Sequence, residues 1–155
     1  MFNFLSKEEI KLSKEFEKDC FIKKKIPSKH LKVIHQIIYK IIKKELKIKK
    51  NYKIQHLLNN VHKLIQVKDL NSFRVKIISK INKNPDFKKN FYYLAKPFLD
   101  NLVGNELAMQ NSINLSIQLP NDESSLLPVH SDVWSGDSPF EIVVWLPLVN
   151  CFKTK

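Results

Sequence analysis

The spacing of apolar side chains changes once along the chain, near Gly104, and this change limits the folds that the sequence can adopt. Before that glycine, apolar residues recur three or four positions apart, which predicts amphipathic helices. After it, between Asn111 and Leu119, they recur at every second position, which predicts a strand with one buried face. The sequence therefore predicts a helical first half followed by extended segments.

Local signals mark the ends of several predicted helices. Ser6 and Glu9 have the spacing of a capping box, in which the side chain of each residue bonds the backbone N–H of the other. Pro85 suits the first turn of a helix, whereas Pro97 is expected to kink or divide that same helix. The expected amphipathic segments are residues 31–42, 54–65, 70–81 and 86–103.

The second half is expected to form strands. Residues 111–119 alternate apolar side chains with a polar row that would suit a lined cavity, and residues 140–149 are almost continuously apolar. The continuous run predicts a strand covered on both faces, although Pro147 indicates a bulge or an edge position. A loop is expected over residues 120–128 and a short third strand around His130. The fold class predicted from these elements is α+β.

Composition excludes several classes of protein. No stretch approaches the 18 apolar residues of a membrane span, and the charges over residues 1–20 exclude a secretory signal. Two cysteines, Cys20 and Cys151, are too few for a disulfide framework and too far apart for a C-x-x-C motif. With only two glycines the chain has no phosphate-binding loop. We therefore expect a cytoplasmic protein without a membrane span.

The positive charge is confined to the first half. Residues 1–96 hold 25 basic and 8 acidic side chains (net +17), whereas residues 97–155 hold 2 and 7 (net −5). Of the 27 basic residues, 26 are lysine, and lysine lacks the bidentate geometry with which arginine reads nucleic acid. We expect a solvated lysine surface and no nucleic-acid partner. The alternative is a basic helical binding module for nucleic acid or anionic surfaces.

The pair His130 and Asp132 is the candidate for chemistry. On an extended segment, residues two apart project to the same face, so an imidazole and a carboxylate converge. One nitrogen and one oxygen donor are two corners of the facial triad of two histidines and one carboxylate that holds Fe(II). Ser131, between them, would face away from His130, and no G-x-S-x-G motif is present, so serine hydrolysis is disfavoured. The alternative, purely structural interpretation of the pair is a loop histidine that is hydrogen-bonded to a turn aspartate.

Three stretches of the sequence resemble a known enzyme family. They are L-L-N-N-V-H-K (Leu57–Lys63), N-E-L-A-M-Q (Asn105–Gln110) and, above all, the 38 residues from Asn114 to Cys151, which include P-V-H-S-D-V-W-S-G-D-S-P-F-E-I-V-V-W-L-P-L-V. Together they resemble the sporadic carbohydrate cluster Fe(II)/2-oxoglutarate oxygenases, which are relatives of the phytanoyl-CoA dioxygenase superfamily. The resemblance covers the chain from about residue 54 onward.

The resemblance implies a fold and a site. It implies a helical part over residues 1–104 and the first strands of an incomplete double-stranded β-helix (jelly-roll) over residues 105–155, together one incomplete domain. His130 and Asp132 would bind iron, Trp145 would lie beside the 2-oxoglutarate pocket, and Asn114 would contact the cosubstrate or the active site.

The resemblance also implies a reaction and shows a departure. The implied enzyme is a dioxygenase that hydroxylates a small molecule, possibly a sugar or glycan precursor, with O₂ and 2-oxoglutarate. The family pattern then requires a distal histidine and a basic residue for 2-oxoglutarate, but no histidine follows His130 in this sequence. We therefore expect an N-terminal fragment that is inactive alone.

Overall fold

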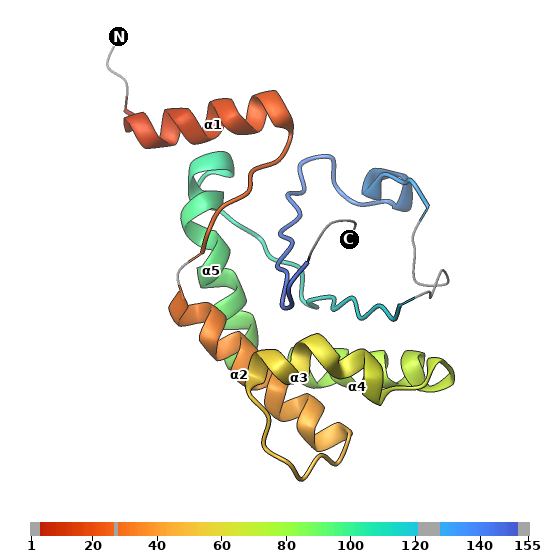
Figure 1. Cartoon of the computed structure of the whole chain (residues 1–155). Helices are drawn as coiled ribbons and strands as arrows, with labels where there is room; N and C mark the ends of the chain where they lie inside the picture. The colour runs from red at the N-terminus through yellow and green to blue at the C-terminus, as the bar shows by residue number, and fades with distance from the viewer. Residues whose placement is uncertain (1–3, 27, 121–127, 152–155) are drawn as a thin grey trace. The chain divides into compact units, whose positions relative to one another are not determined.

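The computed structural model describes residues 4–26, 28–120 and 128–151, and of Ser28 only the backbone. The chain divides into two compact units, each built from two stretches of sequence. Unit 1 comprises Met1–Ile37 and Ile81–Ile113, and unit 2 comprises Ile38–Lys80 and Asn114–Lys155. The helices are α1 (Lys7–Asp19), α2 (Ser28–Glu45), α3 (Ile54–Asn60), α4 (Leu70–Asn82) and α5 (Pro85–Val103), with 3-10 turns η1 (Val61–Leu64), η2 (Val67–Asp69) and η4 (Asp132–Ser135) (Figure 1).

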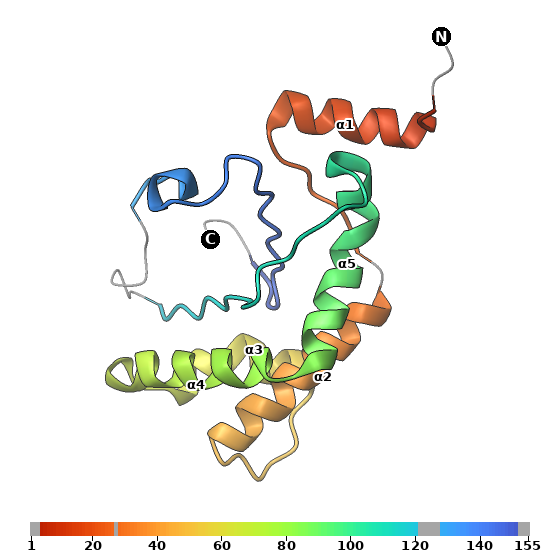
Figure 2. The ribbon, with the colours of Figure 1, turned by 180° about the vertical axis from the view of Figure 1, so that it is seen from behind.

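The predicted capping box at the start of α1 is confirmed. The Ser6 hydroxyl accepts from the Glu9 N–H at 3.2 Å, and the Ser6 N–H donates to Glu9 Oε2 at 2.6 Å. Hydrogen bonding from Ser6, chiefly from its backbone N–H, lowers the pKa of the Glu9 carboxyl. Cys20 ends the helix in the left-handed conformation, with φ of 58°. In Figures 1 and 2, α1 lies across the C-terminal end of α5 within unit 1, and the two helices are in contact.

Helix α5 begins as its sequence predicts. Asn84 precedes it and accepts from the Phe87 N–H at 3.1 Å, and Pro85 occupies the first turn. The helix continues through Pro97, so this proline does not divide it. Leu94 and Ala95, on the turn before the proline, are buried in unit 1. The buried apolar side chains of unit 1 are Leu12, Ile34, Ile81, Phe87, Leu94, Ala95 and Ile113.

Unit 2 has its own apolar core. Helix α3, the turn η1 that contacts it and most of α4 belong to this unit. Isoleucine, leucine and phenylalanine side chains at helical spacing fill the space between the elements, and Ile77 is completely inaccessible to solvent. The buried apolar side chains of this unit are Ile38, Ile42, Leu57, Leu58, Leu70, Phe73, Ile77, Ile117 and Leu119. The apolar residues that recur three or four positions apart on the helices are thus buried, as the sequence predicts.

Residues 113–119 are held by side chains of α4. In unit 1, Asn82 exchanges two hydrogen bonds with the backbone of Ile113: Asn82 Nδ2 donates to its carbonyl at 2.9 Å, and its N–H donates to Asn82 Oδ1 at 2.7 Å. In unit 2, Arg74 donates to the Ile117 carbonyl from Nε at 2.7 Å and also from Nη2. Within residues 113–119, burial alternates, because Ile113, Ile117 and Leu119 are buried whereas Asn114, Ser116 and Gln118 are exposed.

The predicted α+β fold class, with the first strands of a jelly-roll, is wrong. Over residues 4–26, 28–120 and 128–151 the chain contains helices and irregular segments but no strand. A period of two predicts a strand, but it requires only an extended chain with one buried face. Here Asn82 and Arg74 satisfy backbone groups that a neighbouring strand would otherwise pair. The short strand expected around His130 is likewise absent from the described segments.

Residues 140–149 also differ from their prediction. The segment is irregular, and instead of being covered on both faces it exposes alternate apolar side chains, with Val143 65% and Trp145 71% exposed. Helix α3 of unit 2 holds the chain just after residue 149, since the Asn150 N–H donates to Asn59 Oδ1 at 3.1 Å. The loop predicted over 120–128 lies mostly outside the described residues, which resume at Pro128.

No helix among the described residues is long and apolar enough to cross a membrane. This finding agrees with the absence of a long apolar run in the sequence.

Candidate metal site

The side chains of His130 and Asp132 converge in unit 2. His130 Nε2 lies 3.5 Å from Asp132 Oδ1. The geometry follows from the backbone, because Ser131 between them is extended, with φ of −121° and ψ of 135°, and places its two neighbours on one side of the chain. Asp132 then begins the turn η4, which Gly136 ends with φ of 97°. The pair therefore lies in a loop and a 3-10 turn, not on the jelly-roll strand that the resemblance implies.

A backbone carbonyl fixes which nitrogen of His130 faces the aspartate. Nδ1 lies 2.7 Å from the Pro128 carbonyl oxygen, which can only accept, so Nδ1 carries the proton of this hydrogen bond. In the neutral ring, Nε2 then holds a lone pair. Nε2 is the nitrogen that lies 3.5 Å from Oδ1 of Asp132. Two electron-rich atoms at this separation repel each other unless a proton or a cation lies between them.

The separation of the two atoms is longer than a hydrogen bond and compatible with a shared divalent cation. An N–H···O hydrogen bond spans about 2.7–3.2 Å, whereas Nε2 and Oδ1 are 3.5 Å apart. Two donors that each lie about 2.1 Å from one ion are about 3.0 Å apart at neighbouring octahedral positions and about 3.4 Å apart at tetrahedral ones. A small adjustment of either side chain therefore places both atoms within bonding distance of one ion.

The site is open and holds two protein donors. The side chains of His130 and Asp132 are 44% and 51% exposed. In the part of the chain that the structure describes, no group of three or more histidine, cysteine, aspartate or glutamate side chains converges. His30, His35, His56 and His62 all lie in helices or in the turn η1, away from the loop that carries the pair in sequence. The pair could thus supply two neighbouring ligands of one ion. Solvent or a cosubstrate would supply the remaining ligands.

Asn114 and Trp145, the predicted cosubstrate contacts, are both exposed. Asn114 lies on the exposed face of the segment 113–119, and Trp145 lies on the exposed face of the segment 140–149. Unit 2 also contains a cavity of about 340 Å³ that Glu45, Asp69 and Lys76 help to line. None of the four predicted site residues lines it. The roles of Asn114 and Trp145 therefore stay predictions.

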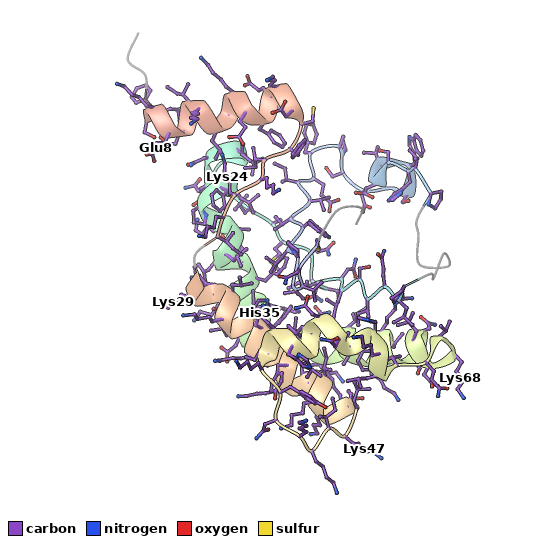
Figure 3. All side chains as sticks on the ribbon, in the orientation of Figure 1. Glu8, Lys24, Lys29, His35, Lys47 and Lys68 are labelled. Carbon is purple, nitrogen blue, oxygen red and sulfur yellow. The ribbon has the colours of Figure 1, made fainter. Side chains whose placement is uncertain are left out.

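The lysines of the first half contact neighbouring side chains and solvent. In unit 1, Lys24 pairs with Glu15. In unit 2, Lys43 and Lys44 occupy the last turn of α2, where positive charge stabilises the helix dipole. Figure 3 shows Lys47 projecting outward from the segment that follows α2. These contacts are typical of a solvated lysine surface, and the alternative of a basic binding module stays a prediction.

Sequence reasoning missed the carbonyl of Pro128, because every residue has a carbonyl and no residue type marks the one that meets an imidazole. The only available signal is the position of Pro128, two residues before the histidine.

No protein-family model matches the chain, and neither a curated protein nor a solved structure is significantly similar to it.

Proposed function

We propose that His130 and Asp132 supply two iron ligands of an Fe(II)- and 2-oxoglutarate-dependent oxygenase that acts on a small molecule, with a sugar or glycan precursor as the substrate class. The observation that carries the proposal is the 3.5 Å approach of a histidine lone pair to a carboxylate oxygen. A carboxylate and a neutral imidazole are the donor types of the iron sites in this class of enzyme. The quoted resemblance over residues 114–151 supports the choice of iron and cosubstrate.

The residues of this chain have separate tasks in the proposed site. The Pro128 carbonyl holds the proton on Nδ1 and so keeps Nε2 of His130 available as a donor. Asp132 supplies the negative charge that offsets part of the charge of the ion. When bound, Fe(II) would supply the redox chemistry that activates O₂ for hydroxylation. Solvent exposure of both side chains leaves room for 2-oxoglutarate at the remaining positions.

The test is an anaerobic calorimetric titration of the 155-residue chain with Fe(II), in the absence and presence of 2-oxoglutarate. We expect weak binding that 2-oxoglutarate tightens, because the cosubstrate supplies the donors that the protein pair lacks. The variants His130→Ala and Asp132→Asn should each weaken binding at least about tenfold, which corresponds to about 1.4 kcal/mol for a lost donor.

Two matched variants in unit 2 control for general effects of substitution. His62→Ala removes an imidazole from the turn η1, and Asp137→Asn removes a carboxylate from the loop after η4. Both should bind Fe(II) as the unaltered chain does. Equal loss in all four variants, or no loss in His130→Ala, would exclude the assignment of this pair. Binding that 2-oxoglutarate leaves unchanged would retain a metal site but contradict the oxygenase.

A further inference from the structure

Unit 1 contains an open cavity of about 480 Å³ that is separate from the His130 pair. Helix α5 supplies one wall with two lysines and, one turn later, two tyrosines: Lys88, Lys89, Tyr92 and Tyr93. The segment after α5 supplies the other wall with Met109, Gln110 and Asn111. A volume of this size is within the range of small-molecule sites.

The charge of the cavity is uncompensated. Two lysines line it, and its lining includes no aspartate or glutamate. Lys88 Nζ donates to Asn111 Oδ1 at 3.1 Å, and this bond joins the two walls while leaving the ammonium group its full charge. The remaining lysine of α5, Lys96, is paired with Asp100 at 2.6 Å, and this bond raises the pKa of its ammonium group. The cavity is therefore suited to an anion.

The aromatic side of the cavity is held in place by a chain of contacts. Asn90 Nδ2 donates to the Asp86 carbonyl at 2.7 Å, which turns Oδ1 of Asn90 toward His30 Nδ1 at 2.8 Å. The ring of His30 stacks on Tyr93 with 5.9 Å between centroids, and Tyr92 meets Tyr93 edge to face at 5.5 Å. Rings that are ordered before binding lose little entropy when a planar ligand packs against them.

We propose that this cavity binds a phosphate monoester carried on a planar ring, of which a mononucleotide is the simplest case. Lys88 and Lys89 would bind the phosphate, since ammonium groups donate strong charge-assisted bonds to its oxygens. Tyr92 and Tyr93 would contact the ring system, because aromatic side chains stack on bases of every type. Gln110 Oε1 and Asn111 Nδ2 would supply an acceptor and a donor for the edge of the ring, since Gln110 Nε2 donates to the Ser112 carbonyl and Asn111 Oδ1 accepts from Lys88.

The same chemistry is present in a free nucleotide and in a single strand of nucleic acid, and the experiment separates the two. The 155-residue chain is titrated by calorimetry with AMP, adenosine, inorganic phosphate and a ten-residue oligothymidylate. We expect saturable binding of one AMP per chain, with adenosine and inorganic phosphate each bound at least about tenfold more weakly, since each lacks one half of the contacts. The oligonucleotide should bind no more tightly than AMP.

Variants assign the binding to this cavity. Lys89→Gln removes one exposed charge and should weaken AMP binding about tenfold, because a charge-assisted bond to the phosphate is lost. Lys83→Gln, in the exposed turn before α5, is the matched control and should leave binding unchanged. Far-UV circular dichroism confirms that each variant keeps its helices.

Three outcomes would overturn the proposal. The first is the absence of saturable AMP binding. The second is an equal loss in Lys89→Gln and Lys83→Gln, which would indicate a general effect of positive charge. The third is an oligonucleotide that binds much more tightly than AMP with a steep dependence on salt, which would assign the lysines to a nucleic-acid backbone instead.

Discussion

The exchange of hydrogen bonds between Asn82 and Ile113 gives a prediction about how the extended segment is held. Asn82→Ala removes both bonds and leaves the N–H and the carbonyl of Ile113 without this partner. Ile113 is only 5% exposed, so water reaches these groups poorly. Each lost bond costs about 1 kcal/mol, and a backbone group left unsatisfied adds to that cost. We expect the free energy of unfolding to fall by about 2–3 kcal/mol.

The variant Asn82→Asp tests the direction of the two bonds. It keeps the oxygen that accepts from the Ile113 N–H but turns the second bond into a contact between two acceptors, a carboxylate oxygen and the Ile113 carbonyl, so we expect a loss at least as large as that of one bond. Asn71→Ala provides the matched control, because Asn71 is an exposed asparagine on the same helix, α4. Its substitution should change the free energy of unfolding by less than about 0.5 kcal/mol.

The assay combines urea denaturation with amide hydrogen exchange. In a chain of this length, a loss of 2 kcal/mol corresponds to a decrease in Tm of about 4–8 °C. Exchange of the Ile113 amide should accelerate in Asn82→Ala and stay slow in Asn71→Ala. If the Ile113 amide stays protected in Asn82→Ala while the stability is unchanged, another partner holds the segment and the reasoning is wrong.

Three further predictions concern single residues. Lys47 follows α2 with φ of 51°, a conformation that costs a residue with Cβ about 1 kcal/mol, so Lys47→Gly should raise the free energy of unfolding by about that amount in urea titrations, whereas a loss would contradict the strain. The hydrogen bond from Lys80 lowers the pKa of Glu45, so the pair should stabilise the fold by about 0.5 kcal/mol above the ordinary glutamate pKa of about 4.3 and lose this contribution as the pH falls through the lowered pKa. In Glu45→Gln this part of the pH dependence of stability should be absent. Trp134 and Trp145 are 78% and 71% exposed, so acrylamide should quench nearly all of the tryptophan fluorescence of the native chain, and a protected fraction would contradict the exposure of these segments.

The local features of the fold could be predicted because their bonds join residues close together in sequence. The capping box joins Ser6 to Glu9, and the start of α5 joins Asn84 to Phe87, three positions apart in each case. The residue types in such short windows determine the bond almost alone. The convergence of His130 and Asp132 belongs to the same class, because one extended residue between them is sufficient.

The partners and the burial of the extended segments could not be predicted in this way. The alternation over 113–119 indicated correctly which side chains are buried, but the backbone partners Arg74 and Asn82 lie 43 and 31 positions from the groups that they bind. Nothing in a period of two distinguishes a strand partner from a helix side chain. The prediction that residues 140–149 are covered on both faces was wrong for a related reason. Apolar composition predicts burial only where another element covers the segment.

The most direct test of the proposed metal site is NMR of the five histidine rings during titration with a small amount of Fe(II) or Mn(II). A paramagnetic ion broadens the resonances of nuclei within its immediate surroundings. Our account predicts that the ring signals of His130 broaden first and that those of His30, His35, His56 and His62 persist. Unchanged His130 signals, or equal broadening of all five rings, would contradict it.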